Sequence, residues 1–227
     1  MRIANIAARV PSRVVTNSEV INRIEEASGA FSGDIEPTLN LIRRMLRASG
    51  AKTRRWLSRN ESALEMTKDA CLEAVENCDG QIDLLVYAGV DIELAEPSTA
   101  NFIAHEIGLD HVRCFDVRGA CGGWVSAMWL AQALIETEAC RRIIVVNAEF
   151  PMRKGGAITP KLFSLSSAEE LAWRFPAFTL GEGVVATVVD SDPDNRWSFT
   201  DITRNNYWDI CTVTPPWQTE CIAKSTR

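Results

Sequence analysis

The chain has 227 residues, of which 46% are hydrophobic, and a formal net charge of −6. This length and composition suit one large domain or two small ones with enough apolar surface for a core, and the acidic balance argues against a general nucleic-acid-binding role. No apolar stretch approaches the roughly 20 residues of a membrane span, and the N-terminal segment is too short and too charged to predict a secretory signal.

Apolar periodicity, capping residues and glycine or proline stops predict strands and helices that alternate along the chain. In chain order, the first are a strand at 3–10, helices at 17–26, 39–48 and 62–78, a strand at 84–89 and a helix at 98–107. There follow a strand at 112–117, a helix at 122–137, a strand at 143–147, a short helix opened by Ser167, and strands at 184–189 and 197–203. Ser62 and Ser167 each begin a capping-box pattern. The alternation predicts an α/β protein with a largely parallel or mixed sheet.

Cys121 lies on the turn between the predicted strand 112–117 and the predicted helix 122–137. A thiol at that position faces unpaired backbone N–H groups and the positive end of the helix dipole. Both favour the thiolate, which is the reactive form of the side chain. The arrangement matches a nucleophile elbow with sulfur in place of oxygen. The alternative is a buried structural cysteine, which is common in protein cores, but the turn favours a nucleophile.

The chain contains seven cysteines, an odd number, and no pair of them has zinc-type spacing. We therefore expect free thiols in a reducing cytoplasm. The six cysteines other than Cys121 lie in ordinary periodic or loop contexts, and we interpret them as packing residues. They are Cys71, Cys78, Cys114, Cys140, Cys211 and Cys221.

The run Asp116-Val117-x-x-Ala120-Cys121-x-Gly123 resembles the active-site segment of the ketoacyl-synthase III branch of the thiolase superfamily. Four other segments resemble that family in the expected order, at 10–17, 49–55, 97–100 and 179–183. The resemblance implies a thiolase-like fold, a layered αβαβα architecture with a mixed sheet. It further implies that residues 1–192 form the N-terminal half and that 193–227 begin an incomplete second half. Residues 220–227 have the pattern of an opening helix, so we expect the sequence to end inside an element.

The segment from Glu96 to Ala100 is most similar to enzymes that join two fatty acyl thioesters head to head. Residues 54–57 and 206–208 also resemble that subgroup. The resemblance implies that Glu96 reaches a neighbouring subunit's active site and acts there as a base. That task needs a carboxylate whose pKa is raised by burial. The alternative, a solvated acid before the helix that Ser98 begins, stays open.

The resemblance implies an acyltransferase in which Cys121 accepts an acyl group and a second acyl or malonyl thioester is then condensed with it. Acyl-coenzyme A or an acyl carrier protein would supply the substrates, and no metal or redox cofactor is required. The family's catalytic histidine and asparagine lie in the second half of its fold, and neither His105 nor His111 matches them. We therefore expect a complementary half or second subunit, in a homo- or hetero-oligomer, or else a truncated product. The alternative function is a non-catalytic or degenerate subunit that serves as a binding or dimerisation module.

The segment 43–59 holds seven positive charges and no acidic residue, which is unusual in an acidic chain. One interpretation is a landing site for coenzyme A phosphates or an acidic carrier, with Arg54 and Arg55 as contacts. The other is a solvated helix face. Trp56 either stacks on an adenine or lines a pantetheine tunnel, or it is a core residue. Arg153, with Lys154 and Lys161, is a further candidate for the same rim.

Two tryptophans lie on the predicted helix that follows Cys121. We expect Trp124 and Trp129 to be core residues, and Trp124 is close enough to the nucleophile to shape the acyl pocket. Gly181 and Gly183 either allow the backbone to approach a ligand or make a tight turn into the next strand; the turn is the favoured interpretation.

Overall fold

A computed structural model describes residues 1–76, 78, 80–92, 95–153, 156, 158 and 161–200, with only the backbone at 161. The chain divides into two compact units, each built from separate stretches of sequence. Among the described residues, the first unit comprises Met1–Val10, Asn60–Glu149 and residues 183–200, and the second comprises Pro11–Arg59 and Phe150–Glu182. The expected division at residue 192, the opening helix at 220–227 and the motif at 206–208 depend on residues outside this description.

The first unit is built on a five-stranded mixed sheet with strand order β1-β7-β6-β4-β5. The strands are β1 (Arg2–Arg9), β4 (Leu84–Tyr87), β5 (Arg113–Asp116), β6 (Arg142–Glu149) and β7 (Gly183–Asp190). β4 lies parallel to both β5 and β6, whereas β7 pairs antiparallel with β6 and with β1. The prediction of an α/β protein with a mixed sheet is confirmed.

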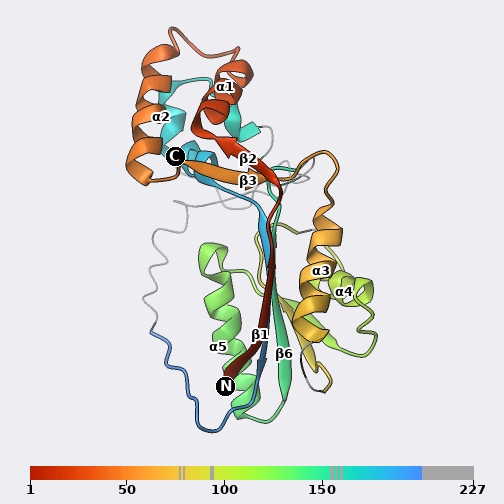
Figure 1. The fold of residues 1–227 in the computed structure, drawn as a ribbon. Coiled ribbons are helices and arrows are strands. Elements are labelled where there is room, and N and C mark those ends of the chain that lie inside the picture. Colours follow the sequence, from red (N-terminus) through yellow and green to blue (C-terminus); the bar gives the residue numbers. More distant parts are fainter. Residues whose placement is uncertain are drawn as a thin grey trace. The chain divides into compact units, whose positions relative to one another are not determined.

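Helices cover both faces of this sheet (Figure 1). α3 (Ala63–Glu76) and α4 (Thr99–Glu106) lie on one face, and α5 (Gly123–Glu136) lies on the other. All four residues of β4 are buried, which is the expected consequence of a strand covered from both sides. The α5 side holds an apolar cluster in which Ala127 and Met128 of α5 pack with Val86 and Val145 of the sheet.

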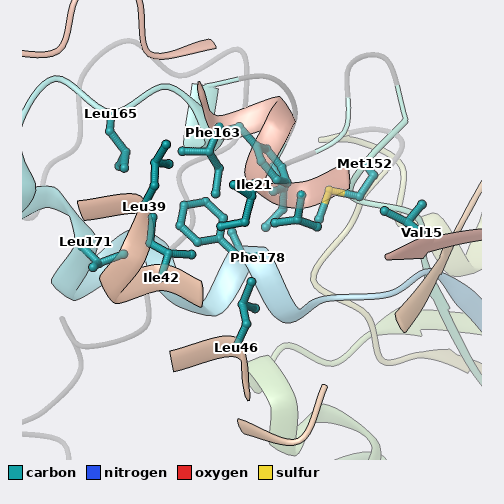
Figure 2. Close-up of a cluster of buried hydrophobic side chains, with 14 of the residues drawn as sticks. Val15, Ile21, Leu39, Ile42, Leu46, Met152, Phe163, Leu165, Leu171 and Phe178 are labelled. Atoms are coloured by element: carbon teal, nitrogen blue, oxygen red, sulfur yellow. The ribbon is translucent and has the colours of Figure 1, made fainter. Parts of the chain in front are cut away.

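The second unit combines α1 (Asn17–Ala27), α2 (Glu36–Ser49) and a two-stranded antiparallel sheet of β2 (Arg13–Thr16) and β3 (Thr53–Trp56). Its remaining described elements are short, with α6 at Leu171–Arg174 and single 3₁₀ turns at Lys161–Phe163, Ala168–Glu170 and Phe175–Thr179. Figure 2 shows its core, in which Ile42 of α2 packs with Phe163 and Phe178, all three fully buried.

Local capping explains where the two helices of this unit begin and end. The Thr16 hydroxyl accepts from the Glu19 N–H at 3.2 Å and the Glu19 carboxylate accepts from the Thr16 N–H at 2.7 Å, a complete capping box. α2 ends at Gly50, which adopts the left-handed conformation with φ +75°. Glycine does so without steric cost, as the stop signal predicts.

Two local predictions from the sequence are wrong. Ser167 makes no side-chain cap; the Glu170 carboxylate instead accepts from the N–H of Ser166 at 2.9 Å. Within the predicted strand 197–203, the described residues 197–200 are not a strand. Trp197 packs against the α5-side cluster of the first unit, and its carbonyl accepts from the Gln132 side chain at 3.0 Å.

In the described part of the chain, no helix is both long enough and apolar enough to span a membrane.

Candidate active site

Cys121 is exposed at the carboxyl end of β5, in a 3₁₀ turn over Ala120–Gly122 that leads directly into α5. The preceding residue, Ala120, has φ +45°, a left-handed conformation that costs an L-residue about 1–2 kcal/mol. Such strain persists only where the surrounding structure enforces it, and it is concentrated at functional sites. The expected strand-to-helix turn is therefore present, and exposure argues against the alternative of a buried structural cysteine.

Two glycines allow this turn to pack closely. A Cβ on Gly123 would lie 2.9 Å from the carbonyl oxygen of Ala88 in the loop after β4, and one on Gly119 would lie 3.1 Å from the Cα of Gly123. Both contacts are with backbone atoms, which cannot rotate away. The start of α5 is therefore held against the end of β4 at a distance that a larger residue would increase.

Replacing Gly123 with alanine is expected to destabilise the first unit by about 1–3 kcal/mol, because overpacking forces the backbone to move. The Cys121 turn would shift with it, and the alkylation rate of Cys121 by iodoacetamide would change. Gly122→Ala is the matched control, because a Cβ there meets nothing within 4 Å. Urea unfolding and the alkylation rate check both effects; equal behaviour of the two variants would contradict the close-packing account.

Among the five cysteines that the structure describes, Cys121 is the only exposed one. Burial raises the pKa of Cys71 to about 12. Burial, with a smaller contribution from a nearby aspartate in each case, also raises the pKa of Cys114 and of Cys140 above the ordinary thiol value. These thiols stay protonated near neutral pH, where only a thiolate is a good nucleophile.

The two tryptophans of α5 have different environments. Trp124 is half-buried against the α5-side cluster, and its indole N–H donates to the Thr187 hydroxyl at 3.4 Å. Trp129 is 64% exposed, so the prediction that it belongs to the core is wrong. α5 is apolar around most of its circumference, and periodicity alone cannot tell which side of such a helix faces the sheet.

Glu96 lies in the segment between β4 and α4, and its side chain is exposed. The loops after β4 and β5 leave the sheet at the same edge, because the two strands are parallel and Tyr87 pairs with Asp116 at their ends. Glu96 and Cys121 therefore belong to neighbouring loops. The burial that a general base requires is not supplied to Glu96 by the described residues of this chain.

Two carboxylates to which the sequence analysis gave no individual role hold backbone N–H groups at this edge. Asp116 accepts from the N–H groups of Thr99 and Ala100, both at 2.9 Å. Glu149 accepts from the N–H groups of Val90 at 2.7 Å and Asp91 at 3.2 Å. Burial raises the pKa of Glu149 above its ordinary value. Each is the last residue of its strand; that position could be predicted from the sequence, but the N–H groups that each carboxylate holds could not.

In the second unit, the two candidate arginines differ in accessibility. Arg54 is 5% exposed, and its Nη1 donates to the Asn17 side-chain oxygen at 2.8 Å. Its Nε and Nη2 are buried and without a hydrogen-bond partner among the described residues, and burial lowers the pKa of Arg54. Arg55 is exposed and donates to the Ser12 carbonyl at 2.7 Å. Only Arg55 presents its charge to solvent.

Trp56 is 3% exposed, and its indole N–H donates to the Leu180 carbonyl at 3.0 Å. Its ring makes an edge-to-face contact with Phe163 at 5.8 Å between centroids. The guanidinium groups of Arg13 and Arg23 lie 5.9 and 5.3 Å from the ring centroid, within the range of cation–π attraction. The structure thus favours the core interpretation of Trp56 over stacking on a ligand.

Glu182, between Gly181 and Gly183, is a buried carboxylate. Glu182 accepts from the N–H groups of Leu57 at 2.6 Å and Met152 at 2.7 Å, and half-buried Arg153 follows Met152. Gly181 and Gly183 do not have positive φ angles. Neither Lys154 nor the side chain of Lys161 is among the described residues. The structure therefore gathers Cys121, Trp124 and Glu96 in the first unit, and Arg54, Arg55, Trp56 and Arg153 in the second.

Comparisons with known proteins agree with the fold and the cysteine segment. The family described as 3-oxoacyl-[acyl-carrier-protein] synthase III matches residues 115–153. The β-ketoacyl-[acyl-carrier-protein] synthase III of Aliarcobacter butzleri is 27% identical, over 91% of this chain and 56% of its own length. That of Acholeplasma laidlawii is 34% identical, over 63% of this chain and 44% of its own length. The chain spans about half the length of the curated relatives that it matches, 56% and 52% for two of them.

Solved structures show the same fold. The synthase III of Aquifex aeolicus superposes with a TM-score of 0.63 at 22% identity, covering 85% of this chain and 54% of that one. A variant of OleA from Xanthomonas campestris gives 0.64 at 23% identity, covering 82% and 56%. These structures confirm the thiolase-like fold, and the family match and the sequence relatives confirm the resemblance to the ketoacyl-synthase III branch.

Proposed function

We propose that this chain carries the acyl-accepting nucleophile of a β-ketoacyl synthase III-like acyltransferase. The observation that supports the proposal most strongly is the exposed thiol of Cys121 on a strained turn at the start of α5, inside the segment 115–153 that the family matches. Relatives named β-ketoacyl-[acyl-carrier-protein] synthase III support the reaction class.

In the first step the thiolate of Cys121 attacks the carbonyl carbon of an acyl thioester. A new C–S bond forms, the tetrahedral intermediate collapses, and the thiolate of coenzyme A or of the carrier leaves with the electron pair of the broken C–S bond. Backbone N–H groups at the turn, that of Cys121 among them, would stabilise the oxyanion. The product of this step is an acyl-enzyme.

In the second step a carbanion attacks the carbonyl of the acyl-enzyme, a C–C bond forms, and the Cys121 thiolate is released. The carbanion arises by loss of CO₂ from a malonyl thioester, or by transfer of an α-proton to Glu96 in the head-to-head version. We propose that a histidine and an asparagine from a complementary half complete the site. A partner that covers Glu96 would also supply the burial that the base role requires.

The exposed positive charges of the second unit are suited to the phosphates of coenzyme A or to an acidic carrier. Five of the seven charges of the segment 43–59 are exposed, namely Arg44, Arg47, Lys52, Arg55 and Arg59. Arg43 and Arg47 also line a groove of about 310 Å³ with Asn17 and Ser18, at the start of α1, where the helix dipole favours an anion. We therefore assign phosphate binding to this surface, with Arg55 rather than Arg54 as its contact from β3.

An apolar face of the first unit is suited to the complementary half. Ile3 and Ile6 pair with Val189 and Thr187 of β7, and Val189 and Thr187 contact the α5 side, so the two isoleucines point to that side as well. They are 38% and 54% exposed. Trp129 of α5 is 64% exposed on the same side. We infer that these exposed apolar side chains contact the complementary half.

Replacing Trp129 with lysine is expected to weaken association with the complementary half by at least about tenfold, since buried tryptophans dominate interface energies. The melting temperature of the chain itself would stay unchanged, because the side chain is exposed. Trp173→Lys, at a position 55% exposed in the second unit, is the matched control. Sedimentation of the mixed polypeptides measures association. Equal association by both variants, or unfolding of the Trp129 variant, would contradict this assignment.

Incubation of the chain and a complementary half with two acyl thioesters tests the reaction class. A β-ketoacyl product detected by mass spectrometry is the expected result. The Glu96→Gln variant distinguishes the decarboxylative reaction from the head-to-head reaction. Loss of product only with non-malonyl substrates would assign proton abstraction to Glu96. The second candidate, a non-catalytic binding or dimerisation module, is favoured by the exposed apolar face; it predicts association without any acyl adduct.

A further inference from the structure

The loop that carries Glu96 is anchored at its C-terminal end by Asp116. Both oxygens of this carboxylate accept from the first N–H groups of α4, those of Thr99 and Ala100, at 2.9 Å each. Asp116 is the last residue of β5, and Cys121 follows it five positions later. These two hydrogen bonds therefore attach the residues after Pro97 to the strand that leads to the Cys121 turn.

The other end of the same loop is anchored by Glu149 at the end of β6. Its two oxygens accept from the N–H groups of Val90 and Asp91, at 2.7 and 3.2 Å. The Tyr87 hydroxyl, which has one proton to donate, lies within hydrogen-bond distance of the carbonyls of Asp91 and Ala148, the latter at 2.7 Å. Side chains from β4 and β6 thus hold the first residues of the loop at the carboxyl edge of the sheet.

We propose that Asp116 and Glu149 are positioning residues that hold the Glu96 loop, from both of its ends, beside the Cys121 turn. This inference rests on the proposed function, in which the loop presents Glu96 as a base near Cys121. Each carboxylate binds two backbone N–H groups, and bonds to an ionised acceptor are roughly twice as strong as neutral ones. The anchors act through backbone atoms, so Glu96 itself remains exposed and available to a partner.

The test compares wild type with Asp116→Asn and Glu149→Gln, which keep side-chain size but replace one acceptor oxygen by a donor. Glu106→Gln is the matched control, because Glu106 lies at the opposite end of α4 and pairs with Lys68 at 3.5 Å. Amide hydrogen exchange of the whole chain, read by mass spectrometry, is measured in overlapping peptides that cover 88–92, 95–101 and α3. Iodoacetamide alkylation of Cys121 is measured in parallel.

Exchange at Thr99 and Ala100 in Asp116→Asn, and at Val90 and Asp91 in Glu149→Gln, is expected to rise at least about tenfold, because the acceptor that protects those N–H groups is weakened. Exchange in α3 and alkylation of Cys121 are expected to stay within about twofold of wild type, since a local anchor leaves the rest of the unit folded. Unchanged exchange at these four N–H groups in both variants, or equal increases throughout the unit, would overturn the inference. Using two variants at separate loop ends covers the case in which one fails to fold.

A failure of the proposed function would have a different signature. If wild-type Cys121 takes no acyl group from acyl-coenzyme A, the reaction assignment fails, while the exchange measurement still decides whether the two carboxylates anchor the loop. If acylation occurs and condensation is measurable, Asp116→Asn is expected to lower condensation and to leave acylation unchanged. Equal loss of both steps would assign Asp116 to overall stability and overturn the positioning role.

Discussion

Replacing Cys121 with alanine is expected to abolish transfer of an acyl group to the chain, lowering the rate by at least about 1,000-fold. The reason is geometric as well as chemical. Cys121 alone among the described cysteines is exposed, and it precedes α5 on a strained turn. Transfer is measured as incorporation of a labelled acyl group from acyl-coenzyme A, with release of free coenzyme A measured by chromatography.

Cys114→Ala is the matched control for this experiment. Cys114 lies on β5, on the same strand that leads to the turn, but it is half-buried and burial raises the pKa of its thiol. The control is expected to keep the wild-type rate of incorporation. Acyl incorporation that persists in Cys121→Ala and disappears in Cys114→Ala would show that Cys114, and not Cys121, is the nucleophile.

Replacing Trp56 with alanine is expected to destabilise the second unit by about 3–5 kcal/mol, the range for a large aromatic residue lost from a core. The ring is 3% exposed and contacts Phe163, and its N–H bond to Leu180 would be lost as well. Urea unfolding followed by a probe in this unit measures the change. Trp173→Ala is the control, because that side chain is 55% exposed and surface substitutions stay within about 0.5 kcal/mol.

The same variant separates the two interpretations of Trp56. If the ring stacked on an adenine, Trp56→Ala would keep its unfolding free energy and lose affinity for coenzyme A. The structure predicts that outcome for the neighbouring residue instead. Arg55→Ala is expected to keep the unfolding free energy and to lose affinity for coenzyme A, because the Arg55 side chain is exposed and donates to the Ser12 carbonyl.

Much of the first unit could be predicted because its signals are local. The apolar run of β4 predicts a strand covered on both faces, and the small residues around Cys121 predict a strand-to-helix turn. The short strands β2 and β3 were not predicted, since four residues each carry too little periodicity to be recognised. Their pairing joins residues that are about 40 positions apart, from Arg13 to Trp56.

The environments of individual side chains could not be predicted, because they depend on tertiary packing. Trp129 and Trp124 look alike in an apolar helix, and only the sheet decides that one faces inward. Arg54 and Arg55 are adjacent basic residues, yet strand alternation buries the first and exposes the second. Asp116 and Glu149 gain their roles from N–H groups on other segments, which no sequence pattern displays.

The mass of the intact wild-type chain after incubation with acyl-coenzyme A tests the central claim most directly. The account predicts an increase of one acyl group, located by peptide fragmentation on Cys121 and removed by hydroxylamine, which cleaves thioesters. An unmodified chain under conditions in which iodoacetamide alkylates Cys121, or an acyl group on any other residue, would contradict it.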